Sequence, residues 1–300
     1  MKSFLEKLEE KVLVAMGAVG TNLGARGMKL GQNAAQWCFN HPEEFRGLIK
    51  QYVDINCDIL TAASSSANRL ILSKYGFQDQ TREINIKLAR IAKEVVRGDM
   101  YVAGTLCSIS LATGRFLSPL GDLSFEEVYE SYKEQVESLA EGGVDLIWVI
   151  TMADIEEAST AVRVVKECTD LPVIASMAFN PTSKGFRTIM GVDPQTAARK
   201  LQEEGADIVG TNCGGTSIED TTKIIQEMRE ACSCYLVAKP NAGTPHLVQG
   251  QTVYPVTPEQ MVKEVPNWIN AGARIISGCC GATSDHITQM ITVVNQMKNN

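Results

Sequence analysis

The sequence predicts an α/β protein, and more specifically a single (β/α)8 (TIM) barrel domain spanning residues 1–300. Short apolar runs alternate with amphipathic helical stretches along the whole chain. Eight strand–helix units over this length give roughly 37 residues per unit, which is typical of such barrels. Three helix-to-strand junctions also share one design, in which a glycine ends the helix and an aliphatic run follows. They are Gly143-Val-Asp-Leu-Ile, Gly205-Ala-Asp-Ile-Val and Gly272-Ala-Arg-Ile-Ile.

The expected strands are short runs without polar alternation, as in strands that are covered on both faces. They lie near residues 12–17, 58–63, 101–106, 146–151, 172–178, 206–212, 235–240 and 274–279. Helices fill the intervals, and the last helix covers about 284–297. The clearest helix is 125–139, where apolar residues recur at spacings of three and four. Ser124 and Glu127 predict a capping box at its start, and Gly142-Gly143 ends it.

An open, doubly wound sheet is the competing architecture, but it normally uses five or six strands and would leave units unused. Gly17-Ala18-Val19-Gly20 follows the first predicted strand, yet its spacing does not match the dinucleotide-binding pattern G-x-G-x-x-G. A tight turn from strand to loop explains these glycines better. No stretch resembles an interdomain linker, so one domain is expected.

Composition excludes several classes of function. The chain has 28 Lys and Arg against 35 Asp and Glu, so its net charge of -7 provides no general attraction to nucleic acid or to anionic membranes. The longest strongly apolar stretch, 146–152, is far shorter than the roughly 20 residues of a membrane-spanning helix. The first twelve residues lack the apolar core of a signal peptide. A cytoplasmic protein that binds neither nucleic acid nor membranes is therefore expected.

The nine cysteines are the main chemical lead, because disulfides are rare in a reducing compartment. Cys213 ends the sixth predicted strand, and Cys279 and Cys280 end the eighth. The carboxyl ends of barrel strands form the active-site rim, so these three thiols are expected to converge there. Three thiolates suit a catalytic zinc ion that keeps a fourth position open. The alternative is that they are inert buried cysteines. Cys107 ends the third strand, and its role stays open.

Several motifs resemble the homocysteine S-methyltransferase family, whose members are zinc-dependent (β/α)8 barrels. Cys213 in Gly-Thr-Asn-Cys-Gly-Gly and Cys279-Cys280 in Ser-Gly-Cys-Cys-Gly-Ala resemble its zinc ligands. Gly17-Ala-Val-Gly-Thr resembles its D-G-A-M-G-T motif, and Ala67-Asn-Arg resembles the end of E-T-N-T-F-G-A-N-R. The resemblance runs the length of the chain. It is strongest to the homocysteine-binding module of cobalamin-dependent methionine synthase.

The departures from the family pattern fall on acidic positions that help to hold the ammonium group of homocysteine in relatives. The acidic residue before Gly17 is Met16 here, and the E-T-N-T-F stretch is replaced by Thr61-Ala-Ala-Ser-Ser. A glutamate at the end of the fourth strand is replaced by Ile150. Asp154 lies close enough in sequence to serve as a substitute. The residues expected around the substrate are Met16, Gly17, Ala18, Thr61, Ala63, Ile150, Thr151 and Asn212.

Asn212 directly precedes Cys213, which suggests two roles. It either hydrogen-bonds a metal-ligating sulfur and orients the strand end, or it is a buried amide that bonds backbone groups.

The resemblance therefore implies a zinc-dependent methyltransferase whose small substrate is a thiol, thioether, methyl ether or methylated amine rather than homocysteine. The chain contains no D-x-H-x-x-G cobalamin motif, so a separate corrinoid protein is expected to dock over the loops 107–124 and 241–257. One alternative is ordinary homocysteine methylation with substituted contacts. Another, from a different class, is a barrel that binds zinc or a small ligand without catalysis.

Overall fold

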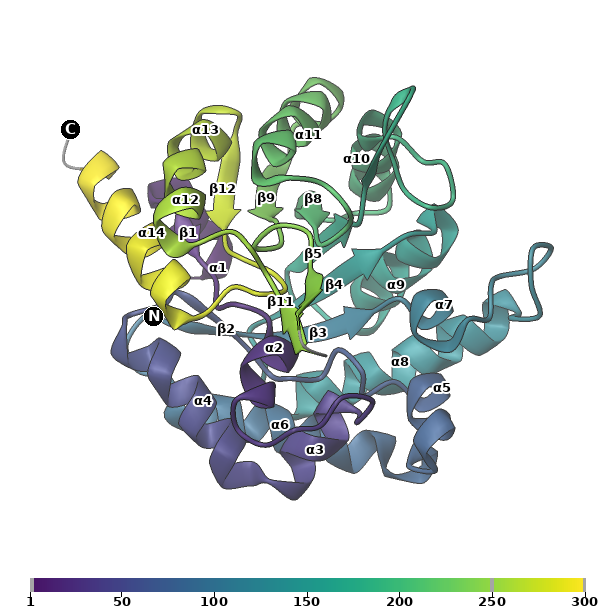
Figure 1. The fold of residues 1–300 in the computed structure, drawn as a ribbon. Coiled ribbons are helices and arrows are strands. Elements are labelled where there is room, and N and C mark those ends of the chain that lie inside the picture. Colours follow the sequence, from purple (N-terminus) through teal and green to yellow (C-terminus); the bar gives the residue numbers. More distant parts are fainter. Residues whose placement is uncertain (1–2, 249–250, 299–300) are drawn as a thin grey trace.

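The computed structural model describes residues 3–248 and 251–298, and its centre is an eight-stranded parallel sheet. The spatial order is β1-β12-β9-β8-β5-β4-β3-β2, and a parallel bridge between Ala15 and Ile59 links β1 to β2. The sheet is thus wrapped into a TIM barrel with helices on the outside (Figure 1). The predicted fold class is confirmed, and the open sheet is excluded.

All eight predicted barrel strands are present, although most are shorter than expected. They are β1 (Leu13–Val14), β2 (Ile59–Thr61), β3 (Tyr101–Cys107), β4 (Leu146–Met152), β5 (Val173–Met177), β8 (Ile208–Asn212), β9 (Tyr235–Lys239) and β12 (Ala273–Ile276). The first strand shows why the ends differ. Beyond β1, Ala15 N donates to Ile276 O and Met16 N donates to Ile59 O, so pairing continues outside the regular strand.

The helices that follow the strands form the outer layer. They are α4 (Pro42–Asp54), α6 (Thr81–Val95), α8 (Phe125–Glu141), α9 (Ile155–Cys168), α10 (Pro194–Glu203), α11 (Ile218–Ala231), α13 (Val265–Asn270) and α14 (Ser284–Lys298). Helix α8 begins at the predicted capping box, in which Ser124 and Glu127 bond each other's backbone N–H groups. No helix in the described ranges combines the length and apolar character that crossing a bilayer requires.

The barrel interior is filled by a cluster of buried side chains from all eight strands, among them Ile59, Trp148, Ile208, Val237 and Ile275. Helix α1 (Phe4–Glu10) closes the end at which the strands begin. Its buried side chains Phe4 and Leu8 belong to the same cluster, and Phe4 meets Tyr101 edge to face. The opening at the other end, where the strands finish, is therefore the candidate entrance for a ligand to the barrel interior.

Additional short elements follow the strand ends and surround that opening. They are α2 (Val19–Gly24), α3 (Ala34–Asn40), α5 (Arg69–Leu72), α7 (Ile109–Thr113), α12 (Pro258–Met261), the 3-10 turns η1 (Ser73–Tyr75), η2 (Gln78–Gln80) and η3 (Val262–Glu264), and the hairpins β6 (Asn180–Thr182) with β7 (Gly185–Arg187) and β10 (His246–Val248) with β11 (Gln251–Val253). The two hairpins were not predicted, since strands of three residues carry little periodic signal.

Gly104 provides a test of packing between the barrel and its outer helices. A Cβ at this β3 position would lie 2.9 Å from Leu139 Cδ1 and 3.1 Å from Ile147 Cδ1. We expect Gly104→Ala to lower the free energy of unfolding by about 1–2 kcal/mol, because two side-chain ends must shift in a filled core. Chemical denaturation measures the change. Gly24→Ala is the control, since a Cβ there meets nothing within 4 Å; equal effects would contradict the packing argument.

Candidate metal centre and substrate pocket

The three predicted zinc ligands lie together at the open end of the barrel. Cys213 follows β8, and Cys279 and Cys280 follow β12. The Cys213 sulfur lies 2.7 Å from that of Cys279 and 3.8 Å from that of Cys280. All three sulfurs are within 4.8 Å of one another, and they form the one cluster of possible metal ligands found among the described residues.

Local backbone geometry places these sulfurs. Cys213 has a φ of 54°, in the left-handed region that non-glycine residues rarely occupy, and Gly214 follows at 76°. A Cβ on Gly214 would lie 2.1 Å from Phe179 O, so glycine is required there. Ala63, just after β2, has a φ of 56°, and Thr151, near the end of β4, has a φ of 57°. Such strained residues cluster at functional sites, where the surrounding structure holds them in place.

Asn212 connects the cysteine cluster to the fourth strand. Its Oδ1 accepts from Thr151 N at 2.8 Å and from Ser176 Oγ at 2.7 Å. Its Nδ2 donates to Thr151 Oγ1 at 2.6 Å and approaches Cys279 Sγ at 3.7 Å. The side chain thus contacts both a sulfur of the cluster and the backbone.

The sulfur atoms do not share negative charge evenly. Hydrogen bonds from Cys213 and Cys280 lower the pKa of Cys279, and Lys239 and Asn212 assist, although burial opposes the shift. The hydrogen bond to Cys279 raises the pKa of Cys213 well above its ordinary value. The surroundings of Cys279 therefore favour a thiolate at this position.

This donor set fits a zinc ion. Zinc–sulfur bonds of about 2.3 Å in a tetrahedral site separate sulfurs by about 3.8 Å. The Cys213–Cys280 separation already has that value, and the shorter Cys213–Cys279 pair would widen to accept the metal. Three protein ligands leave one position for a substrate atom, as in catalytic rather than structural zinc sites.

A cavity of about 440 Å³ opens beside the sulfurs. Six of the residues predicted to surround the substrate line it: Gly17, Ala18, Thr61, Ala63, Ile150 and Thr151. Met16 and Asn212 are fully buried and lie behind this lining. The Met16 Sδ accepts from Thr61 N at 3.1 Å and from Thr61 Oγ1 at 3.3 Å. Cys107 also lines the cavity, away from the metal-ligand cluster.

None of the described residues that line this cavity is acidic. Asp154, the expected substitute for the missing carboxylates, caps helix α9 instead. It accepts from Glu156 N at 2.8 Å and from Glu157 N at 3.4 Å, and it is not part of the lining. The cavity therefore offers hydroxyl, amide, thiol and apolar groups but no carboxylate partner for an ammonium ion.

Two buried charged residues escaped the sequence analysis. Lys239, at the end of β9, lines the cavity behind the cysteines, and Glu157 supports the segment that carries Cys107. Glu157 accepts hydrogen bonds from Ser108 Oγ, Tyr132 Oη and two backbone N–H groups. Burial raises its pKa, although these donors oppose the shift. Lys239 could have been found from the sequence, because a lysine within the apolar run 235–239 is unusual. No feature of the sequence pointed to Glu157.

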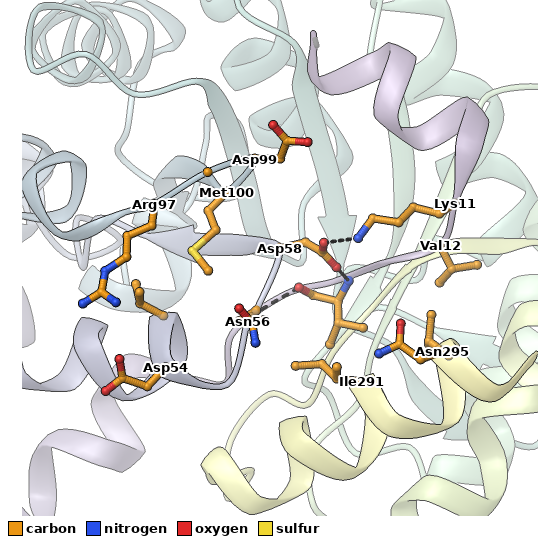
Figure 2. A pocket seen from close by; sticks show the side chains of 15 residues that line it. Lys11, Val12, Asp54, Asn56, Asp58, Arg97, Asp99, Met100, Ile291 and Asn295 are labelled. Atoms are coloured by element: carbon orange, nitrogen blue, oxygen red, sulfur yellow. Dashed lines mark hydrogen bonds and ion pairs between the residues drawn. The ribbon is translucent and has the colours of Figure 1, made fainter. Parts of the chain in front are cut away.

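A second cavity, of about 470 Å³, lies at the opposite end of the barrel, where the strands begin. Figure 2 shows Lys11 directed toward Asp58, with which it forms an ion pair, and Arg97 on the other side of the cavity. The Asp58 carboxylate also accepts from Val14 N at 2.9 Å. Lys11 and Val14 N both bond to the Asp58 carboxylate, which ties the first two strands together. The metal-ligand cluster lies at the other end of the barrel.

Comparison with known proteins agrees with this geometry. The family model described as homocysteine S-methyltransferase matches residues 13–294. Methionine synthase from Mycobacterium leprae is 24% identical over 308 residues, which cover 97% of this chain and 25% of that protein. Its counterpart from Mycobacterium tuberculosis is 25% identical over 312 residues, which cover 98% of this chain and 25% of that protein. The chain thus spans about a quarter of the length of these curated relatives.

Solved structures show the same fold. The metallated form of the homocysteine methyltransferase MmuM from Escherichia coli has a TM-score of 0.80 and 21% identity, covering 96% of this chain and 99% of that chain. A methyltransferase from Methanosarcina mazei has a TM-score of 0.60 and 9% identity, covering 96% of this chain and 95% of that chain.

Proposed function

Because the chain belongs to the homocysteine S-methyltransferase family, we propose that it is a zinc-dependent methyltransferase acting on a small substrate other than homocysteine. In this proposal the methyl group passes between that substrate and a separate corrinoid protein. The observation that carries it is a complete three-cysteine cluster beside a cavity whose described lining has no carboxylate. The methyl-transfer centre is thus retained, while the recognition of an amino-acid ammonium group is not.

Cys213, Cys279 and Cys280 would hold the zinc ion as thiolates, with the fourth position facing the cavity. When bound, zinc would act as a Lewis acid that stabilises the unmethylated sulfur or oxygen of the substrate as an anion near neutral pH. Asn212 restrains the Cys279 sulfur through Nδ2 and fixes the β4 end through Thr151. Gly17 and Ala18 shape the wall between the cavity and the cysteine loop, where a Cβ on Gly17 would lie 2.8 Å from Ala282 O.

The charge of the cavity favours a substrate without an ammonium group. Burying a cation without a charged partner costs several kcal/mol. Quaternary ammonium ligands are usually held by several aromatic rings, and Tyr75 is the one aromatic residue among the described lining. Of the four substrate types considered, a thiol, a thioether or a methyl ether therefore fits better than a methylated amine.

The rim of the opening fits a protein partner. Large hydrophobic side chains are exposed on segments that follow the strand ends, including Leu30, Tyr75, Leu111, Leu120 and Leu247. Exposed apolar residues grouped around an active site are typical of docking surfaces. They include parts of both predicted docking loops, 107–124 and 241–257, although residues 249–250 of the second lie outside the described residues. The proposed partner is a corrinoid-carrying domain that brings its cofactor to this opening.

X-ray absorption at the zinc K-edge tests the substrate. We expect the reduced protein to show three sulfur ligands both with and without excess homocysteine, because nothing in the described lining pairs with its ammonium group. A fourth sulfur in the presence of homocysteine would contradict the proposal and favour ordinary homocysteine methylation. A simple thiol without an amino group, such as 2-mercaptoethanol, is the matched control, and it should supply a fourth sulfur.

Methyl exchange separates enzyme from binding protein. The proposed enzyme should exchange a methyl group with free methylcobalamin when a suitable thiol is present. A barrel that binds zinc and thiols but never exchanges the methyl group would be a non-catalytic binding protein.

A further inference from the structure

Lys239 is the last residue of β9, and its side chain enters the barrel just behind the cysteine cluster. It is 2% exposed. Its Nζ donates to Met16 O at 2.7 Å, Ser277 Oγ at 2.8 Å and Gly278 O at 2.9 Å. These acceptors follow β1 and β12, the first and last strands of the barrel. One ammonium group therefore ties together the ends of three neighbouring strands.

The segments tied by Lys239 also carry the cysteine cluster. Gly278 directly precedes Cys279, and the backbone N–H of Cys213 donates to the carbonyl of Lys239 at 3.3 Å. Ser277 Oγ extends the network to Ala15 O at 2.8 Å. The lysine thus contacts the backbone on both sides of the sulfur cluster.

Among the described residues, no carboxylate forms an ion pair with Lys239. All three acceptors of its Nζ are uncharged oxygens, and the Nζ lies 5.5 Å from the centre of the Trp148 ring. An ammonium ion is costly to bury unless a negative charge lies nearby. Burial lowers the pKa of Lys239, and the thiols of Cys279 and Cys213 are the strongest of the electrostatic influences that oppose this shift.

We propose that Lys239 is a positioning residue that supplies the counter-charge of the metal centre, an inference that rests on the proposed function. Three thiolates and one zinc ion have a net charge of about −1, which a lysine ammonium offsets. An anionic substrate atom in the fourth position then adds the only uncompensated charge. The same balance leaves no negative charge for a cationic substrate, which agrees with the absence of acidic residues from the described cavity lining.

The test compares zinc affinity in four full-length proteins by competition with a chromophoric chelator. They are the wild type, Lys239→Met, Lys239→Gln and Ser277→Ala. Lys239→Met removes the charge and the donors, whereas Lys239→Gln removes the charge and keeps an amide donor. We expect both to bind zinc about tenfold or more weakly, from loss of one charge a few ångströms from an anionic centre. Ser277→Ala is the matched control. It removes one of the three acceptors of the ammonium group, together with the hydrogen bond from Ser277 Oγ to Ala15 O, but it keeps the charge; its zinc affinity should stay within about threefold.

The metal-free proteins separate positioning of the metal from general stability. If the lysine only supports the fold, Lys239→Gln will lower the denaturation midpoint without zinc and leave the zinc affinity of the folded protein unchanged, which would overturn the proposal. If a variant folds only with zinc, metal binding is coupled to folding. Its zinc affinity is then obtained from the zinc concentration at which half of the protein is folded. Equal zinc affinities of the Lys239→Gln and Ser277→Ala proteins would also overturn the proposed role of Lys239.

The two proposals fail differently. A wild-type protein that binds no zinc would refute the proposed metal centre and, with it, the role of Lys239. A wild-type protein that binds zinc tightly while the lysine variants bind it equally well would refute the role of Lys239 alone.

Discussion

Replacing Cys279 with alanine should remove zinc from the protein and lower its methyl-transfer rate about a thousandfold or more, the largest effect expected of any single change. Cys279 is the most buried of the three ligands, and its sulfur contacts both Cys213 and Asn212. Two remaining sulfurs cannot complete the three-ligand set. Metal analysis after dialysis against a chelator, together with methyl exchange with methylcobalamin, measures both losses.

Cys107→Ala is the matched control for this prediction. Cys107 lines the same cavity and has a buried thiol, with a pKa raised to about 12 mainly by burial, but it lies outside the three-sulfur cluster. The control variant should keep its zinc. A Cys279→Ala protein that retains about one zinc ion per chain would contradict the assignment of the site.

Glu157→Ala should cause the largest loss of stability, about 3 kcal/mol or more in the free energy of unfolding. The substitution removes the carboxylate acceptor of Ser108 Oγ and of two buried backbone N–H groups, whereas Tyr132 Oη can still donate to Cys107 O at 3.0 Å. Each unsatisfied buried group costs about 1–3 kcal/mol. Chemical denaturation of the reduced protein measures the change. Because Glu157 anchors Ser108 and the start of α7, the methyl-transfer rate should also fall while the zinc content stays unchanged.

The neighbouring residue provides the control. Glu156→Ala removes an exposed carboxylate that pairs with Lys200 at 2.8 Å on the surface. Surface ion pairs contribute at most about 1 kcal/mol, so the control should lose little stability. Similar losses in both variants would show that the buried hydrogen bonds of Glu157 do not stabilise this part of the barrel.

Local patterns in the sequence determined the fold. Buried parallel strands need continuous apolar runs, and helices that cover them need apolar residues every three or four positions, so the order of elements could be counted directly. The capping box at Ser124 depends on two residues three positions apart, and it occurs as predicted. The convergence of Cys213 with Cys279 and Cys280 follows from the same reasoning, because strand ends of a barrel meet at one rim.

The tertiary structure alone decided which side chains face the ligand and which lie behind them. Met16 and Asn212 are fully buried behind the cavity lining, although each lies at a strand end and directly precedes a residue that lines the cavity. Side chains at strand ends change direction with each residue and with local backbone strain, as at Thr151 and Cys213. No sequence pattern records that direction.

The buried charges depend even more on distant contacts. Lys239 bonds to Met16, 223 positions away, and Glu157 bonds to Ser108, 49 positions away. A charge is stable in the interior only where several partners converge on it, and those partners come from different strand ends. Sequence periodicity reports what each segment buries, whereas closure of the barrel determines which segments meet around a buried charge.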